Sequence, residues 1–496
     1  MFRPESAWCK ESQHQPIVNT HATNSLLKPQ RRRCARSAFT RVFVALVLCS
    51  ICLGPWSLAS TRPPNVLFLF SDDQRFDTIH ALGNREIQTP NLDRLVRRGF
   101  AFTHAFCMGA QQGAVCVPSR AMLMTGRSLF RATTTPTSGA IPTALPLWPE
   151  VMRRAGYDTI GIGKWHNDCA SYARAFTAGG PVFFGGMSDH TKVAVHDFDP
   201  TGKYAKERER TATAFSSELF ADAAVDFLCR RRSEKPFFLY IAFTAPHDPR
   251  TPPKEFADLY PPARITLPKN FLPEHPFDNG ELKVRDEALL PWPRTRESVR
   301  REIAAYYGMI THLDAQIGRV LQALEDSGQA DNTIILFAAD NGLAVGRHGL
   351  LGKQSLYDHS VRVPLILAGP GVPKGKRSDA LCYLFDLFPT LCELTGLSAP
   401  ENLEGRSLAP ILRGQRKRVR SEIFGAYRDV QRMVRNERWK LIHYPKIDRW
   451  QLFDLRRNPE EIHDHFPDPD QAARLEAMKR KLTELQLQLD DPLAHR

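Results

Sequence analysis

The feature that most constrains the fold is an alternation that begins at Pro64, in which short apolar runs are followed by longer amphipathic segments. The short runs are rich in β-forming residues, and the longer segments have the length and spacing of helices. This pattern predicts an α/β fold with a mostly parallel central sheet flanked by helices. In open sheets of this kind, ligands bind beyond the carboxyl ends of the strands. The residues that follow each predicted strand are therefore the first candidates for a functional site.

Four of the predicted strands end in polar residues that are capable of chemistry. These strands are residues 66–70, 157–163, 237–243 and 333–339. They are followed by Ser-Asp-Asp, by Lys-Trp-His, by Thr-Ala-Pro-His and by Asp-Asn-Gly, in that order. Because parallel strands end at the same edge of a sheet, we expect these side chains to lie together.

Other segments complete the predicted architecture. Residues 89–99, which begin with Thr and Pro, and residues 298–328 are predicted helices. Residues 250–296 are rich in proline and show little periodicity, so we expect an ordered excursion over the surface near the site. After about residue 400 the pattern changes to an antiparallel meander followed by a charged helix at residues 471–489.

The N-terminal residues differ from the rest of the chain. A basic run that begins at Arg31 precedes an apolar run and a small-residue cleavage pattern ending at Ala59. We interpret residues 1–59 as an export signal, with a retained N-terminal membrane anchor as the alternative, and expect a periplasmic or secreted protein. The remainder divides into a predicted catalytic domain at residues 60–399 and a smaller C-terminal subdomain at residues 400–496.

Charge and cysteine content narrow the class of partner. Removal of the leader lowers the formal charge from +13 to +7 and leaves six of the ten cysteines. A basic exported protein suggests an anionic extracellular partner such as a sulfated polymer, although charge that only promotes solubility explains the same number. No tight Cys/His cluster remains, which argues against a zinc module, and Cys382 and Cys392 are expected in the core. We expect no nucleic-acid partner and no stable membrane insertion.

Asp72, Asp73, Asp340 and Asn341 supply hard oxygen donors from two strand ends. Such donors suit Ca²⁺ or Mg²⁺ rather than a soft metal. Each motif alone is also an ordinary turn or helix-capping sequence. Together, and directly after apolar strands, they predict a metal site.

The same strand ends and one glycine-rich segment provide cations and histidines. Arg120, Lys164 and Lys353 could stabilise charge on a sulfate or phosphate ester. His166 follows Lys164, and His247 lies in a turn from which it could protonate a leaving oxygen. The alternatives are a solvated lysine and a polar loop histidine.

Cys116 precedes Arg120 at the start of a predicted helix. This position predicts a lowered thiol pKa, which would suit a cysteine hydrolase. However, a thiolate is a poor ligand for Ca²⁺ or Mg²⁺, and an exposed thiol in an exported protein is prone to oxidation. These two objections favour the interpretation that residue 116 is not a thiol in the mature protein.

Residues 116–126, CVPSRAMLMTG, resemble the Cys-x-Pro-Ser-Arg-x-x-Leu-x-Thr-Gly signature of the formylglycine-dependent sulfatases of the alkaline phosphatase superfamily. Further segments resemble this family in the same order, including PNVLFLFSDDQ, GIGKWH, TAPHDP and LFDLRRNPEE. The resemblance runs from Pro64 to about Glu461. It implies that a maturation enzyme oxidises Cys116 to formylglycine, whose hydrated aldehyde attacks sulfur through one hydroxyl and expels sulfate through the other.

The resemblance also implies roles for the residues singled out above. The implied ligands of a divalent cation, normally Ca²⁺ with Mg²⁺ as the alternative, are Asp72, Asp73, Asp340, Asn341 and the modified Cys116. Arg120 would hold the formylglycine, and Lys164 and Lys353 would bind the sulfate oxygens. His247 would protonate the leaving oxygen, His166 would assist the diol, and His348 would contact substrate.

The expected function is hydrolysis of sulfate esters on a sulfated polysaccharide or oligosaccharide. One alternative is a phosphodiester or phosphonate monoester hydrolase of the same superfamily, which a site with two metals would favour. A second is a catalytically silent protein that binds sulfated glycans, and a third is a Cys/His hydrolase. Specificity is expected in residues 167–210, in residues 250–296 and in the C-terminal subdomain.

Overall fold

A computed structural model describes residues 62–494, and the predicted leader at residues 1–59 lies outside them. The large sheet has nine strands, eight of them in one hydrogen-bonded order and the ninth paired to the side of it. Its order is β11 (Lys376–Ser378), β2 (Gly99–Phe106), β10 (Arg362–Ala368), β9 (Thr333–Ala339), β1 (Asn65–Ser71), β8 (Phe237–Ala242), β4 (Asp158–Lys164) and β5 (Ala178–Phe183), with β12 (Cys382–Tyr383) paired to β2.

Strand β10 is antiparallel to both of its neighbours, β2 and β9, and the other pairings of the large sheet are parallel. The prediction of a mostly parallel central sheet is therefore confirmed. The four strands expected from the sequence are β1, β4, β8 and β9, and each agrees with its expected bounds to within one residue.

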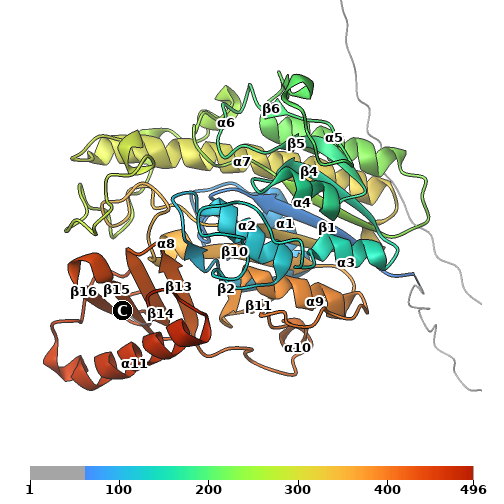
Figure 1. Ribbon diagram of the computed structural model, residues 1–496. Coiled ribbons are helices and arrows are strands. Elements are labelled where there is room, and N and C mark those ends of the chain that lie inside the picture. The colour runs from blue at the N-terminus through green and yellow to red at the C-terminus, as the bar shows by residue number, and fades with distance from the viewer. Residues whose placement is uncertain (1–61, 495–496) are drawn as a thin grey trace, which may run out of the picture. The chain divides into compact units, whose positions relative to one another are not determined.

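Helices cover both faces of this sheet (Figure 1). They are α1 (Pro90–Arg98), α2 (Cys116–Thr125), α3 (Trp148–Arg154), α4 (Cys169–Ala175), α5 (Ser216–Arg230), α6 (Lys254–Ala257), α7 (Arg296–Asp326), α8 (Asp358–Val361), α9 (Leu387–Leu394), α10 (Ala409–Leu412) and α11 (Ala472–Gln488). Because side chains alternate along a strand, Phe68 and Phe70 of β1 pack with α2, α3 and α9, whereas Leu67 and Leu69 pack with α1, α5 and α7. Strand β1 is buried on both faces, as expected for a central parallel strand.

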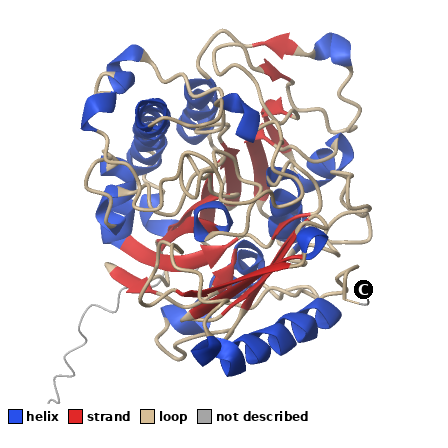
Figure 2. Ribbon diagram, turned by 90° about the vertical axis from the view of Figure 1, so that its left-hand side faces the viewer, coloured by secondary structure: helices blue, strands red, loops and turns tan. Residues whose placement is uncertain are grey.

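The smaller sheet is antiparallel apart from one short strand. Its order is β16 (Arg449–Asp454), β15 (Trp439–Tyr444), β14 (Gln431–Arg435), β13 (Ile423–Tyr427) and β3 (Gly109–Ala110). Helix α11 lies along this sheet (Figures 1 and 2). These elements confirm the expected antiparallel sheet plus helix. Strand β3 pairs in parallel with β13. Because β3 comes from the predicted catalytic domain, the smaller sheet contains backbone from both predicted domains. The domain division at residues 399 and 400 stays a prediction.

Several local predictions can be compared with these elements. Thr89 is the N-cap of α1, but its hydroxyl bonds to Asp93 Oδ1 at 3.1 Å instead of capping the helix backbone. Residues 250–296 contain α6 and short 3₁₀ turns but no strand. A separate two-stranded ribbon pairs β6 (Ala194–Val195) with β7 (Arg210–Thr211).

Cys382 and Cys392 are free and buried, as expected. No helix within residues 62–494 has both the length and the hydrophobicity that a membrane crossing requires.

Candidate active site

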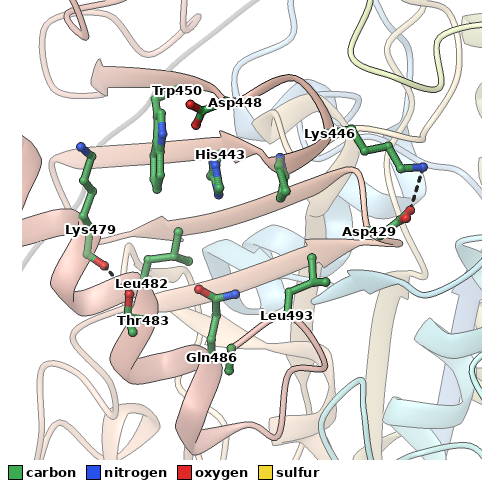
Figure 3. A pocket seen from close by; sticks show the side chains of 12 residues that line it. Asp429, His443, Lys446, Asp448, Trp450, Lys479, Leu482, Thr483, Gln486 and Leu493 are labelled. Carbon is green, nitrogen blue, oxygen red and sulfur yellow. Dashed lines mark hydrogen bonds and ion pairs between the residues drawn. The ribbon is translucent and has the colours of Figure 1, made fainter. Parts of the chain in front are cut away.

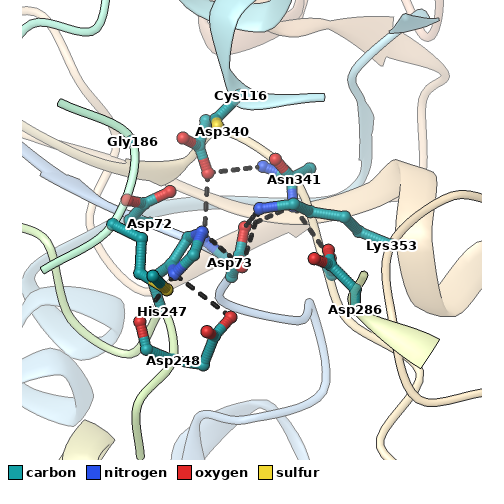
Figure 4. A network of polar contacts seen from close by, with 12 residues as sticks. Asp72, Asp73, Cys116, Gly186, His247, Asp248, Asp286, Asp340, Asn341 and Lys353 are labelled. Atoms are coloured by element: carbon teal, nitrogen blue, oxygen red, sulfur yellow. Dashed lines mark hydrogen bonds and ion pairs between the residues drawn. The ribbon is translucent and has the colours of Figure 1, made fainter. Parts of the chain in front are cut away.

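The carboxyl ends of β1 and β9 bring the predicted acidic residues together. These strands pair in parallel with Ser71 opposite Ala339, so the residues that follow them become neighbours. The backbone N–H of Asp73 donates to Asp340 Oδ1 at 3.0 Å, and Asn341 Nδ2 donates to Asp73 Oδ1 at 2.8 Å. Figure 4 shows these side chains converging with Cys116, His247 and Lys353. Nearly all of the cluster is inaccessible to solvent, which strengthens every charge interaction within it.

Helix α2 contributes Cys116 and Arg120, which lie one turn apart and therefore on the same face. The guanidinium of Arg120 donates to Asp340 Oδ2 through Nε at 3.1 Å and through Nη2 at 2.8 Å. Its Nη1 donates to the carbonyl oxygen of Lys164 at 2.8 Å. Arg120 thereby joins α2 to the ends of β9 and β4.

Two buried lysines pair with the two adjacent aspartates of β1. Lys164 Nζ forms an ion pair with Asp72 and donates a hydrogen bond to the carbonyl oxygen of Gly186 at 2.6 Å. Lys353 Nζ lies 2.8 and 2.9 Å from the two carboxylate oxygens of Asp73. Burial opposes the charged form of Lys353, but the Asp73 carboxylate together with Cys116 and the other nearby carboxylates outweighs burial, so the pKa of Lys353 is raised well above its usual value. Lys353 is therefore held as a cation.

The histidines of the site are neutral in the unliganded protein. Burial, and then the neighbouring lysines, lower the pKa of His166 and of His247 well below the usual histidine value. His247 Nδ1 lies 2.9 Å from the carbonyl oxygen of Asp248, which fixes the proton of the neutral ring on Nδ1. His190 Nε2 lies 3.0 Å from the carbonyl oxygen of His247 and so supports the same turn.

The Cys116 thiol does not have the lowered pKa that its helix position predicts. Burial raises its pKa to about 11, and this outweighs the opposite effect of Lys164 and Lys353. The sulfur lies 3.2 Å from His166 Nδ1 and 3.9 Å from Lys164 Nζ. A protonated thiol is a weak nucleophile, so the environment argues against the Cys/His hydrolase alternative.

The same cluster fits a hard divalent cation. Ligand atoms of Asp72, Cys116 and Asp340 all lie within 4.8 Å of one another. Asp72 Oδ1 and Asn341 Oδ1 are buried and lack a hydrogen-bond partner among the described residues. Burial, and then Asp340, raise the pKa of Asp72 well above its usual value. Two oxygens without partners beside repelling carboxylates suit the coordination of Ca²⁺ or Mg²⁺.

A second group of possible ligands consists of Asp73, His247 and Asp248, whose donor atoms also lie within 4.8 Å of one another. The sequence predicts ligands for one ion only. In the structure, Lys353 already neutralises the Asp73 carboxylate, and His247 Nδ1 faces the Asp248 carbonyl oxygen. This second group therefore has fewer ligand atoms free to bind a metal ion than the first group has.

His348 lies in a different cluster from the residues above. Its ring stacks on Tyr357 with centroids 4.0 Å apart, and its Nε2 lies 2.9 Å from Asn270 Nδ2. Its role in substrate contact stays a prediction.

Sequence reasoning missed other contributors to the site. Arg285, from the proline-rich excursion, bonds to Asp248 and lies 2.7 Å from Asp286 Oδ1, which places this part of the excursion beside His247. Ser119 Oγ donates to the carbonyl oxygen of Asp340 at 2.6 Å. Its position in the Cys-x-Pro-Ser-Arg signature was the available signal, whereas nothing in the sequence marked Arg285.

Known proteins resemble this chain over most of its length. The Sulfatase family model matches residues 64–397, and the model for the C-terminal region of N-sulphoglucosamine sulphohydrolase matches residues 346–488. A sulfatase of Formosa agariphila is 30% identical over 469 residues, with 87% of each chain covered. An N-acetylglucosamine-6-O-sulfatase of Bacteroides thetaiotaomicron is 26% identical, with 90% of each chain covered.

Solved structures show the same fold. One, described as a complex with its substrate D-glucosamine-2-N,6-O-disulfate, superposes with a TM-score of 0.73 and 24% identity. The match covers 88% of this chain and 100% of the other. The family model spans more than half of the chain, and the site contains the residues that the signature predicts. The chain therefore belongs to the sulfatase family, the type I sulfatases of the alkaline phosphatase superfamily, and is a sulfatase.

Proposed function

We propose that this sulfatase removes sulfate from a sulfated carbohydrate, with formylglycine at position 116 and one bound Ca²⁺, for which Mg²⁺ is the alternative. The observation that carries the proposal is the position of Cys116. It lies at the start of α2, beside the buried carboxylates of Asp72 and Asp340 and near Lys164 and His166, and burial raises its thiol pKa to about 11. These surroundings suit an oxygen nucleophile better than a thiol. The hydrated aldehyde of formylglycine would supply that oxygen.

Asp72, Asp73, Asp340 and Asn341 would hold the cation together with the modified residue 116. Asp72 Oδ1 and Asn341 Oδ1 support this set, because neither accepts a hydrogen bond from another of the described residues. A divalent cation here would favour the deprotonated form of a neighbouring hydroxyl and offset negative charge on the substrate. Arg120 fixes the position of Asp340 through two hydrogen bonds and so orients one ligand.

Lys164 and Lys353 would bind the sulfate oxygens, since both are buried amines beside the carboxylates, Lys164 paired with Asp72 and Lys353 with Asp73. They also lower the pKa of His247 in the free protein. An anionic ester between the lysines and the imidazole would offset that effect and favour protonation of His247 in the complex. His247 could then donate its proton to the leaving oxygen. His166, neutral and next to residue 116, could accept a proton from the nucleophile.

The substrate class is supported by the relatives and by charge. The names of the Bacteroides relative and of the structure with bound disulfated glucosamine refer to sulfated amino sugars. The positive charge of this chain suits an anionic glycan. We further propose that the protein is exported to the periplasm or the medium, on the evidence of residues 1–59, and that a maturation enzyme acts on it before or during export.

The test combines mass spectrometry with paired substrates. In protein from a host that contains the maturation enzyme, the peptide with residue 116 should be lighter than the cysteine form by about 18 Da. The protein should hydrolyse sulfated mono- and oligosaccharides and prefer an aryl sulfate over the matching aryl phosphate. Chelation should abolish turnover, and addition of Ca²⁺ or Mg²⁺ to separate samples would identify the ion.

Each contrary result has a definite meaning. An intact thiol in an active enzyme would overturn the formylglycine proposal. A clear preference for aryl phosphate would favour the phosphoryl hydrolase alternative, and binding of sulfated glycans with no turnover would favour the silent binding protein. Activity that survives chelation but is lost on thiol alkylation would favour a cysteine hydrolase.

A further inference from the structure

Two basic segments that are distant in sequence line one hollow on the surface. Lys-Gly-Lys-Arg at residues 374–377 includes β11, and Arg-Gly-Gln-Arg-Lys-Arg at residues 413–418 directly follows α10. The hollow between them has a volume of about 710 Å³. Its charged lining residues are Lys376, Arg377, Arg413, Arg416, Lys417 and Asp379. Five positive charges therefore face one negative charge.

Most of this positive charge is not neutralised by the protein. Lys376, Arg416 and Lys417 are exposed, and none of them forms an ion pair with another residue of the described part of the chain. Arg413 pairs with Glu393, and Arg377 donates to a backbone carbonyl oxygen. Like charges held close together create a local positive potential, which a polyanion would relieve.

A second hollow of similar volume does not have this excess of positive charge. It lies between the smaller sheet and α11, and its volume is about 670 Å³ (Figure 3). There, Lys446 lies 2.9 Å from Asp429, and Asp448 is also in the lining. The basic and acidic residues of that hollow balance, so it provides no comparable attraction for an anion.

The chemistry of the basic hollow favours a sulfated polysaccharide over other polyanions. Its apolar lining residues, Phe100, Ile411 and Leu412, are buried. Binding to a membrane surface generally also needs exposed apolar side chains, and none of the exposed large hydrophobic residues of the described chain lines this hollow. Single-stranded nucleic acids stack their bases on accessible aromatic rings, which the hollow does not offer. Sulfate groups require only cations at suitable positions.

The hollow and the catalytic residues lie at opposite ends of the strands of the large sheet. Lys376 pairs with Phe100, near the beginning of β2. Strands β2 and β9 are both antiparallel to β10 and therefore run in the same direction. Because Asp340 follows the last residue of β9, β2 begins at the end of the sheet that lies away from Asp340. At about 3.3 Å per residue, the seven residues of β9 span roughly 23 Å. A single sugar cannot reach both places, whereas a polysaccharide chain can.

We propose that the hollow between β11 and the turn after α10 is a second binding site, which holds a sulfated polysaccharide chain apart from the catalytic centre. This inference rests on the proposed function, because it takes the substrate to be part of a sulfated glycan. A chain held there stays near the enzyme, which raises the local concentration of its sulfate esters. Binding at this site lowers the KM for polymeric substrate and leaves the turnover of small esters unchanged.

The test removes three unpaired charges from the hollow in the variant K376Q/R416Q/K417Q. A matched control, R456Q/R457Q/R480Q, removes the same charge from three exposed arginines of the C-terminal region that form no ion pair within residues 62–494. Binding of chondroitin sulfate is measured in the full chain with Cys116→Ala, which prevents desulfation during the measurement. We expect about tenfold weaker binding for the hollow variant, less than twofold for the control, and a smaller dependence of affinity on salt.

Further measurements separate the competing explanations. Hyaluronan, which lacks sulfate, should bind more weakly than chondroitin sulfate, as should vesicles containing phosphatidylserine and a single-stranded oligonucleotide. With position 116 intact, kcat and KM for a small sulfate ester should be the same in both variants. The inference is overturned if the hollow variant binds the sulfated polymer normally, if the control loses equal affinity, or if vesicles or the oligonucleotide bind as tightly. Absence of turnover on all small esters, with polymer binding retained, would instead refute the proposed function.

Discussion

Replacing Lys440 with methionine removes one cation from a buried network that joins the smaller sheet to the chain just after Lys353. Lys440 Nζ lies 2.9 Å from Asp358 Oδ1 and 2.6 Å from Glu461 Oε1. Arg435 Nη1 lies 3.0 and 2.8 Å from the two oxygens of Asp358. Asp358 therefore keeps a cationic partner in the variant, whereas Glu461 loses the one that it has.

The magnitude follows from the burial of this network. Loss of one partner from a buried ion pair costs about 3–5 kcal/mol, and protonation of Glu461 can relieve part of that cost, so we expect about 3 kcal/mol at pH 7.5. Burial raises the pKa of Glu461 and Lys440 lowers it, so the substitution raises this pKa further. An acid whose pKa is higher in the folded state binds more protons there, and the protein loses stability as pH rises through that interval. The deficit should therefore be smaller at pH 5 than at pH 7.5.

Urea unfolding of wild type and variant at both pH values measures this difference. Arg438→Met is the matched control. Arg438 lies two residues earlier in the chain, its side chain is 38% exposed and it pairs with Asp454, so its loss should cost much less stability than the loss of Lys440. The double variant Lys440→Met/Glu461→Gln should recover part of the stability and show less dependence on pH. A Lys440→Met deficit that equals that of Arg438→Met, or that stays constant between the two pH values, would refute the reasoning.

Three further predictions concern the active site. Cys116→Ser should retain the thermal unfolding midpoint to within a few degrees but lose sulfatase turnover, measured with an aryl sulfate; near-normal activity would contradict the mechanism. Asn341→Ala removes one unpartnered oxygen, so Ca²⁺ should raise its unfolding midpoint less than that of wild type at equal concentration, as followed by thermal scans. At Gly186, an added Cβ would lie 2.7 Å from His166 Nε2, so Gly186→Ala should displace this imidazole and lower kcat by about tenfold or more, with steady-state kinetics as the measurement and an unchanged kcat as the contrary result.

The strand ends of the site could be predicted because the arrangement of this fold follows from a repeated local pattern. Buried runs such as residues 66–70 and 333–339 mark strands, and parallel pairing then determines that Asp72 and Asp340 become neighbours. The signature around Cys116 predicted the helix that brings Arg120 to the same place. These inferences needed only local sequence and one rule about parallel sheets.

Contacts that depend on long-range packing gave no comparable signal. Strand β3 has two residues, too few for a recognisable pattern, yet it joins the smaller sheet to the earlier part of the chain. Arg285 reaches Asp248 from a segment without periodicity. The thiol pKa of Cys116 was predicted in the wrong direction because its helix position was visible in the sequence and the extent of its burial was not.

The charges of the site also change the reason for expecting a cation there. From the sequence, the adjacent Asp72 and Asp73 suggested an ion because two carboxylates repel each other. In the structure, each buried carboxylate has its own basic partner: Lys164 for Asp72, Lys353 for Asp73 and Arg120 for Asp340. Repulsion alone therefore does not require a metal. The stronger indication is the pair of buried oxygens, Asp72 Oδ1 and Asn341 Oδ1, that accept no hydrogen bond from any of the described residues. Because the protein charges already balance, a divalent cation bound there would give the site a net positive charge, which is what an anionic sulfate ester needs.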